Sequence, residues 1–533
     1  MKKNTIKILM ALSVVSLMVS SCAKKLDLLP VNDLTPETTY SNAAGYKSVL
    51  AKIYGTLAIT GNSGPAGSPD ISGGLDEGGQ VAFIRGVFNC EELPTDEAVC
   101  AWNDQTVKDF HNLKWTAADP FLKGMYARCI YNVTLINEYL RESTDAKLAQ
   151  RGIAGADAVD IKKSRAEGRF LRAFNYWVMM DLFGKSTFIT EADGIGTFLP
   201  KEKSRGEIFT YIETELKGIE TELAIVKTIE YGRVDQGAAW ALLARIYLNA
   251  KVYTGAERNT DAITYANKVI AGGYSLQPDY RQLFMADNDK RKNEFMFAIN
   301  CDGARTQAYG NTTFLIHAAA GDDHNEFGAS SGWGGYRATK GLADLFSDLS
   351  GNTDKRAAFT TSVFNTSSAQ VNISDISDFK NGLHVNKFKN IRSDGGAVSD
   401  ITLGFSDVDF PVFRLSEMYL IYAEAMLRGG AGANAATAVN YINAIRTRAG
   451  ATPIAATALD LQFVLDERGR ELYWEGHRRT DLIRYNLLTT STYVWQWKGG
   501  IINGTGVDNK YNIYPIPQEN RNSNVNLTQN AGY

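Results

Sequence analysis

Two stretches far apart in the chain repeat one pattern. Residues 262–267 read Ala-Ile-Thr-Tyr-Ala-Asn, and residues 438–443 read Ala-Val-Asn-Tyr-Ile-Asn. Each follows a segment rich in small residues, 237–250 in the first case and 415–428 in the second, across a turn that contains glycine. Small residues let two helices cross at close range, with the repeated tyrosine beside the crossing. The pattern therefore predicts paired helices that stack on one another.

The rest of the chain fits the same class of fold. Apolar residues recur at helical spacing over 36–60, from about 120 to 140 and over 164–183. Residues 61–79 are rich in Gly, Ser and Pro, which indicates a loop, and no alternating strand–helix pattern is present. At 533 residues the chain is too long for one ordinary core. We expect an all-α body in which tetratricopeptide-like helix pairs form a scaffold with long inserted loops.

Composition and charge exclude several classes of protein. The chain is 44% hydrophobic and 22% charged, an ordinary globular composition that fits neither a disordered nor a polytopic membrane protein. A formal net charge of -3 offers no basic face for nucleic acid. Aromatic residues are abundant, with 25 Tyr, 24 Phe and 8 Trp. We expect some of these rings to fill the helical core and others to be displayed for stacking on a ligand.

The N-terminus is organised as a targeting signal. Three lysines flank an apolar run over residues 8–19 that is too short to span a bilayer and ends in Val-Ser-Ser-Cys at Cys22. A bacterial lipoprotein signal peptidase requires small residues directly before a cysteine, so residues 1–21 are predicted to be removed and Cys22 to carry a lipid anchor. An ordinary signal peptide with a chance cysteine is the alternative. An extended tether over residues 22–35 is expected to follow.

The remaining cysteines do not form a metal-binding pattern. Cys90 and Cys100 bracket a short polar segment, so a local disulfide between them and fully reduced thiols both stay open. The spacings of zinc sites, such as Cys-x-x-Cys and His-Glu-x-x-His, are absent from the sequence. We expect no metal centre and no cofactor.

The stretch Asp466–Asn486 has the densest charge of the chain and resembles an active site at first sight, because it combines carboxylates, arginines and His477. Helical spacing, however, places Arg468 on an apolar stripe, where Glu471 three residues later is able to pair with it. A break at Gly476 is then expected, after which Arg478, Asp481 and Arg484 tie the next helix to the scaffold. A buried, mutually satisfied ionic network accounts for this charge without catalysis.

A second informative region runs from Tyr309 to Lys340. It contains Gly-x-Ser-x-Gly around Ser330, but no apolar strand precedes it, so the match to the nucleophile elbow of hydrolases is attributed to chance. Its acidic residues lack the spacing of a calcium loop. Binding of a calcium ion by their side-chain oxygens nevertheless stays open. Trp333, in Gly-Trp-Gly-Gly, lies on a polar loop without periodicity. It is either a platform for a sugar ring or an anchor of the loop on the core.

Several of these motifs together resemble the SusD/RagB family of outer-membrane nutrient-binding lipoproteins. They are the lipobox at Cys22, the helices 164–183 and 413–428, the pattern Arg470-Glu471-Leu472-x-x-Glu475-Gly476-x-Arg478-x-x-Asp481-Leu482-x-Arg484, and Tyr514-Pro515-Ile516-Pro517. The resemblance implies an all-α body with four tetratricopeptide-like pairs, divided here as 36–280 and 281–533. It also implies a SusC-like TonB-dependent transporter as partner. Members capture glycans, or in some branches peptides, at the outer membrane without cleaving them.

The starch-binding branch of this family implies five ligand-binding residues. Trp102 and Trp333 stand where that branch keeps its tryptophans, and Tyr309, Arg85 and Gln105 match by spacing. The resemblance also implies a lipid-anchored protein displayed at the cell surface, although Ala-Lys-Lys after Cys22 departs from the acidic residues of many surface-exposed members.

Two other functions stay open at this stage. One is a lid that binds peptides for the same kind of transporter. The other is a surface glycoside hydrolase, which needs two carboxylates facing one cleft, with Asp96 and Glu326 as the candidates.

Overall fold

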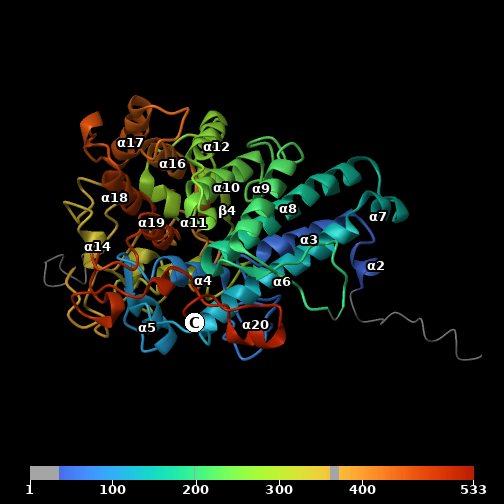
Figure 1. The fold of residues 1–533 in the computed structure, drawn as a ribbon, viewed down its shortest axis with the longest axis horizontal. Helices are drawn as coiled ribbons and strands as arrows, with labels where there is room; N and C mark the ends of the chain where they lie inside the picture. The colour runs from blue at the N-terminus through green and yellow to red at the C-terminus, as the bar shows by residue number, and fades with distance from the viewer. Residues whose placement is uncertain (1–34, 197, 361–370) are drawn as a thin grey trace, which may run out of the picture.

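Helices are the main regular structure of the molecule (Figure 1). The computed structural model describes residues 35–196, 198–360 and 371–533, so the predicted signal peptide, Cys22 and nearly all of the tether lie outside the described residues. Within these ranges, strands occur only as the antiparallel pairs β1–β5, β2–β3 and β4–β6. The all-α prediction is confirmed. No helix in the described part of the chain combines the length and apolar character needed to cross a bilayer.

The first half of the chain contributes long helices joined by loops and three short strands. Its elements are α2 (Pro36–Thr39), α3 (Ala43–Gly55), α4 (Phe83–Glu91), β1 (Ala98–Cys100), α5 (Gln105–Asn112), α6 (Pro120–Glu142), α7 (Asp145–Gln150), α8 (Gly155–Phe183), β2 (Ser186–Thr187), β3 (Glu202–Lys203), α9 (Arg205–Gly218), α10 (Gln236–Leu248), α11 (Ala250–Thr254) and α12 (Asn259–Ala271). Helices α3, α6 and α8 lie side by side at one end of the molecule (Figure 1).

The second half alternates short elements with the remaining scaffold helices. Its strands are β4 (Phe295–Ile299), β5 (Tyr336–Ala338) and β6 (Phe410–Arg414). Its α-helices are α13 (Thr312–His317), α14 (Lys340–Ala343), α16 (Leu415–Leu427), α17 (Ala435–Ala449), α18 (Leu461–Leu472), α19 (Arg478–Arg484) and α20 (Gln518–Ser523). Its 3-10 turns are η2 (Tyr280–Phe284), η3 (Asn288–Arg291), η4 (His324–Phe327), η5 (Ala456–Ala458), η6 (Lys498–Gly500) and η7 (Asn509–Asn512).

The predicted helix boundaries hold where capping residues mark them and shift elsewhere. Helix α6 begins at Pro120, as predicted, because the Asp119 carboxylate accepts hydrogen bonds from the first free N–H groups of the helix. The single helix expected over 36–60 is instead α2 and α3, since Asn42 caps a new start by accepting from the N–H of Gly45. Helix α8 begins at Gly155, well before the predicted start at Ser164.

The two repeated stretches form the predicted helix pairs. Helix α10 packs on α12 and α16 packs on α17, while α12 and α16 join the pairs into one stack. In the first pair the rings of Tyr247 and Tyr265 lie 5.6 Å apart. In the second pair Tyr441 stacks on Tyr419 at 4.3 Å with an interplanar angle of 3°. The tyrosine of each repeat therefore packs on its partner helix, as the sequence predicts.

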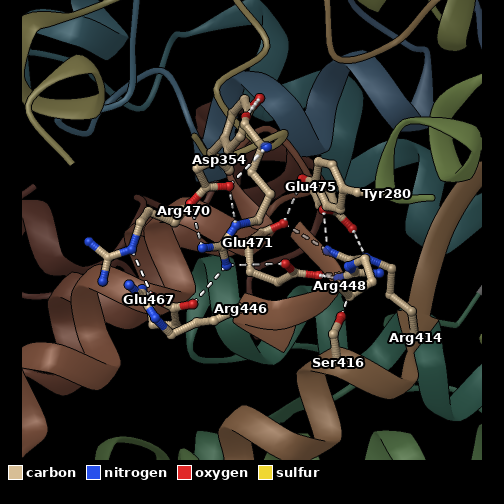
Figure 2. A network of polar contacts seen from close by, with 12 residues as sticks. Tyr280, Asp354, Arg414, Ser416, Arg446, Arg448, Glu467, Arg470, Glu471 and Glu475 are labelled. Atoms are coloured by element: carbon tan, nitrogen blue, oxygen red, sulfur yellow. Dashed lines mark hydrogen bonds and ion pairs between the residues drawn. The ribbon is translucent and has the colours of Figure 1, made fainter. Parts of the chain in front are cut away.

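A buried ionic network joins the C-terminal helices (Figure 2). Glu471 on α18 accepts from Arg414 at 2.7 Å, from Arg356 at 3.4 Å and from Arg448. Arg414 also pairs with Glu475 at 2.6 Å, and all five side chains are at most 4% exposed. Burial acts to raise the pKa of Glu471, but the charges of the three arginines outweigh it and hold that pKa below its ordinary value.

The charged stretch is structural, as expected, but two of its details differ from the prediction. Arg468 pairs with Asp481 at 2.6 Å instead of with Glu471, because the three long-range arginines already surround the Glu471 carboxylate. The helix ends at Leu472, before Gly476, since Trp474 already adopts a left-handed φ of 63°.

The expected ties of the next helix are present. Arg478 pairs with Asp96 at 2.7 Å, and Arg484 pairs with both Glu424 at 2.6 Å and Asp481 at 2.8 Å. These contacts fix α19 to the segment before β1 and to α16.

Cys90 and Cys100 do not form a disulfide. Both are buried free thiols, on α4 and β1, as are Cys129 and Cys301. Burial raises the pKa of Cys100 to about 12, so the thiol stays protonated and unreactive. Of the two alternatives that the sequence leaves open, a local disulfide and reduced thiols, the structure has the reduced thiols.

Removing the central charge of the network is expected to destabilise the fold. Glu471→Gln keeps the shape of the side chain but leaves the buried Arg414 and Arg448 short of an anionic partner. We expect a loss of about 3–5 kcal/mol in the free energy of unfolding, the usual cost of breaking a buried ion pair. Denaturant unfolding followed by circular dichroism measures this loss.

The matched control is Glu138→Gln, which breaks the partly exposed pair with Arg141 on α6 and should cost about 1 kcal/mol or less. Equal losses in the two variants would contradict a special role for the buried network. The loss from Glu471→Gln should also shrink as the pH falls below 4.5, the ordinary pKa of the carboxyl group. Its folded pKa lies lower still, so its stabilising contribution disappears as it takes up a proton.

Candidate ligand-binding surface

A short strand pair brings the two predicted tryptophans together. β1 and β5 are antiparallel, with Cys100 opposite Tyr336, and the N–H of Ala101 donates to the carbonyl of Gly335 at 2.9 Å. Trp102 follows the last residue of β1 and Trp333 precedes the first residue of β5, so both lie at the same end of the strand pair. The three residue pairs between β1 and β5 therefore bring the segments that contain Trp102 and Trp333 next to each other.

The glycines around Trp333 are required by close contacts. A Cβ on Gly335 would lie 2.4 Å from Nε1 of Trp102, and a Cβ on Gly332 would lie 2.2 Å from the carbonyl oxygen of Gly321. A Cβ on Gly334 would lie 3.0 Å from the ring of Phe379. The Gly-Trp-Gly-Gly motif thus makes room for two aromatic side chains and one backbone crossing.

Trp333 has one face on the protein and part of its surface in solvent. Its ring packs on the imidazole of His317 with centroids 4.9 Å apart, and the backbone N–H of Trp333 donates to the backbone carbonyl of His317 at 2.8 Å. Burial lowers the pKa of His317, so this supporting ring is uncharged at neutral pH. Tyr309 lies 6.3 Å from Trp333 and is 41% exposed. Together the two rings form an aromatic surface that is open to solvent.

Trp102 and Arg85 form the second part of the site. Trp102 is half-buried in the loop between β1 and α5, edge-on to Tyr336 at 5.1 Å. Arg85 on α4 lies over Trp102 at 5.4 Å and over Phe314 at 4.9 Å, a cation–π arrangement that keeps its charge beside the rings. The backbone N–H of Arg85 donates to the carbonyl of Gly310, the residue after Tyr309, at 3.0 Å.

Gln105 lies at the edge of this group. It is the first residue of α5, it is exposed, and its amide donates to Asp109 at 2.7 Å. The structure therefore gathers Trp333, Tyr309, Trp102 and Arg85 around the β1–β5 pair and leaves Gln105 on the rim. A ligand role for each of the five residues stays a prediction.

Two aromatic residues near the site were missed by the sequence analysis. Phe405 lies 5.4 Å from Tyr309, and Phe379, on Gly334, is 45% exposed. Phe379 had the same signal as Trp333, a single aromatic ring in a polar loop. Phe405 had no such signal, because its position depends on where the loop before β6 folds.

The residues considered for hydrolysis are not arranged for it. Ser330 follows η4 in a loop, and its N–H donates to the carbonyl of Leu403, so it does not lie at a strand-to-helix turn. Asp96 is buried against Arg478; burial acts to raise its pKa, but the arginine outweighs this and lowers it. Glu326 is exposed and contacts Thr360. Within the described ranges no hydrogen bond joins Asp96 to Glu326.

The aromatic surface is distinct from a hollow of about 900 Å³ elsewhere in the molecule. That hollow lies between α3, the start of α8 and the loop 221–233, and it is lined by none of the five predicted residues. An open aromatic surface suits a long polymeric ligand better than a closed cavity does, because the chain is able to extend beyond it at both ends.

The close packing at Gly335 gives a direct test of the site geometry. We expect Gly335→Ala to displace the Trp102 indole and to lower stability by more than the ~1–2 kcal/mol cost of a left-handed alanine. Near-ultraviolet circular dichroism and thermal unfolding measure the two effects. Gly255→Ala is the control, because Gly255 has a similar φ of +82° but nothing within 4 Å of its Cβ position. Identical behaviour of the two variants would contradict the contact with Trp102.

Comparison with known proteins bears on the family and the fold of the chain. The profile of the SusD family matches residues 271–533. The starch-binding protein SusD of Bacteroides thetaiotaomicron is 36% identical over an alignment of 579 residues that covers 100% of each chain. Among solved structures, a SusD superfamily protein of Parabacteroides distasonis has a TM-score of 0.70 at 22% identity, covering 94% of this chain and 100% of its own. Surface glycan-binding protein A of Bacteroides fluxus has a TM-score of 0.69 at 20% identity, covering 92% and 100%.

The 36% identity to the starch-binding protein over the full length of both chains shows, as the motifs predicted, that this chain belongs to the SusD family.

Proposed function

We propose that the protein captures oligosaccharides or polysaccharides at the outer membrane and delivers them, without cleavage, to a SusC-like TonB-dependent transporter. The observation that carries this proposal is the pair of Tyr309, which is exposed, and Trp333, which is partly exposed and packs on His317; the two rings lie 6.3 Å apart. The starch-binding name of the 36% identical relative points to the same class of ligand.

The chemistry of a sugar fits this surface. One face of a pyranose ring presents C–H bonds, which pack on an aromatic face, while its hydroxyl groups need hydrogen-bond partners at the edge. Arg85 supplies donors close to Trp102, and Gln105 adds an amide on the rim. Because the surface is open and wet, we expect dissociation constants on the order of micromolar to millimolar for short oligosaccharides. Several such contacts along one polymer strengthen the overall binding.

The anchor and the partner belong to the same proposal. Cys22 is proposed to carry the lipid that holds the protein in the outer membrane, facing the cell exterior. A single lipid-anchored binding protein has no route for its ligand across the membrane, so a transporter is needed as the acceptor. Family membership supports a SusC-like transporter in that position.

Trp333→Ala should abolish the retention of the protein by an immobilised glycan. The ring gives up its stacking face, while its loop stays fixed through backbone hydrogen bonds to His317 and Ala320. Affinity electrophoresis through gels that contain soluble starch, laminarin, xylan or inulin measures retention, and thermal unfolding verifies the fold. Trp240→Ala is the control, because Trp240 is also partly buried but lies on α10 beside Glu220. Unchanged retention of Trp333→Ala would contradict the site.

Long incubation with the retained polysaccharide should release no reducing ends. Asp96 is engaged by Arg478 and is not free to act as an acid or a base, so a pair of carboxylates across the ligand is not expected here. A reducing-sugar assay with the wild-type protein measures this. Production of reducing ends that disappears in Asp96→Asn or Glu326→Gln would favour a hydrolase instead. Peptides that co-purify with the protein, together with no retention by any glycan, would favour a peptide-binding lid.

A further inference from the structure

Phe379 is a large apolar side chain in an unusual position. It is 45% exposed and lies in the loop 374–381, which is rich in Ser and Asp. A single exposed apolar side chain is common on a protein surface and needs no special role by itself. What distinguishes Phe379 is its place, because a Cβ on Gly334, the residue after Trp333, would lie 3.0 Å from its ring.

We propose that Phe379 is a further stacking face for the glycan, carried on a loop that is built to hold it there. This inference rests on the proposed function and extends it. A ligand that covers Trp333 and Tyr309 reaches Phe379 only if it continues past Gly334. The protein should therefore favour longer oligosaccharides over short ones.

The loop is held from inside by Arg337. This residue lies on β5, is fully buried, and donates to the carbonyl groups of Ile376 at 2.8 Å, Asp378 and Asn381. No carboxylate forms an ion pair with it in the described ranges. Its charge is satisfied by these three carbonyl groups of the loop and by the carbonyl of Gly335, which accepts from Nε at 3.2 Å. A buried charge that depends on the path of one loop fixes that path, because moving the loop would leave the guanidinium unsatisfied.

Side chains of the loop and of a neighbouring segment fix it further. Asn381 accepts from the N–H of Ser374 at 2.9 Å and donates to Asp378 at 2.8 Å, which closes the loop on itself. Just before the loop, Ile373 accepts from the indole N–H of Trp497 at 2.8 Å and donates to Gln496 at 3.0 Å. The ring of Phe379 is thus exposed on a rigid base.

The same strand supports both aromatic residues. Trp333 and Gly334 lead into β5, and Arg337 within β5 holds the loop of Phe379. The relative position of the two rings is therefore set by one short segment of backbone. Such a pre-arranged pair loses little conformational entropy when a ligand binds, which is what a weak, open site needs.

The test compares Phe379→Ala with Phe198→Ala. Phe198 is the matched control, since it is 44% exposed on a loop elsewhere in the chain. The probe is whichever of soluble starch, laminarin, xylan or inulin retains the wild-type protein, together with a trisaccharide and a heptasaccharide prepared from it. Isothermal titration calorimetry measures the dissociation constants, and thermal unfolding verifies that each variant is folded.

We expect Phe379→Ala to bind the heptasaccharide about three- to tenfold more weakly and the trisaccharide as the wild type does. Phe379→Tyr should restore the affinity, and Phe198→Ala should leave both constants unchanged. Equal affinity of wild type and Phe379→Ala for the heptasaccharide would overturn this inference. If Trp333→Ala still loses retention in that case, the proposed function stands. If none of the polysaccharides retains the wild-type protein, both proposals are wrong.

Discussion

The buried pairing of Arg414 with Glu471 and Glu475 is the interaction on which the C-terminal half depends. Each carboxylate is at most 1% exposed and lies within hydrogen-bond distance of the Arg414 guanidinium. Charges so far from water are tolerated only when every partner is in place, so the network fixes β6, α16, α18 and the turn after α18 in one arrangement. This accounts for the dense charge of residues 466–486 in structural terms. Their acids and bases are already used on one another.

The network connects to the candidate ligand-binding surface through the segment between α4 and β1. In that segment Glu92 accepts from the N–H of Gly476 and of His477, while Asp96 pairs with Arg478. Burial raises the pKa of Glu92 to about 7. The segment starts after the helix that carries Arg85 and ends at the strand that leads to Trp102. The scaffold therefore positions one side of the site directly, and β5 adds the other side by pairing with β1.

Periodicity in the sequence was enough to predict the scaffold but not the partners within it. The helix pairs and the packing of their tyrosines follow from the spacing of residues within each segment, which is visible in the sequence of that segment alone. The expected pair of Arg468 with Glu471 failed because arginines from three other segments compete for that carboxylate, and local spacing contains no information about them. Trp333 stood out as a ring in a polar loop, and resemblance added Trp102 and Tyr309. Phe379 had the same signal as Trp333, a ring in a polar loop, but its place beside Gly334 depends on Arg337 holding that loop, a contact between distant segments that local sequence does not describe.

The division between scaffold and surface has a consequence for specificity. Each ring of the surface is supported by different local contacts: Trp333 by His317, Tyr309 by Gly78 and Phe405, and Phe379 by the loop on Arg337. None of these contacts is part of the ionic network. A change in one of these loops is therefore able to alter which sugar is bound without disturbing the helices, because none of the contacts that hold the rings involves Arg414, Glu471 or Glu475. Binding selectivity in such a protein is a property of its loops, while its stability is a property of its buried charges and stacked helices.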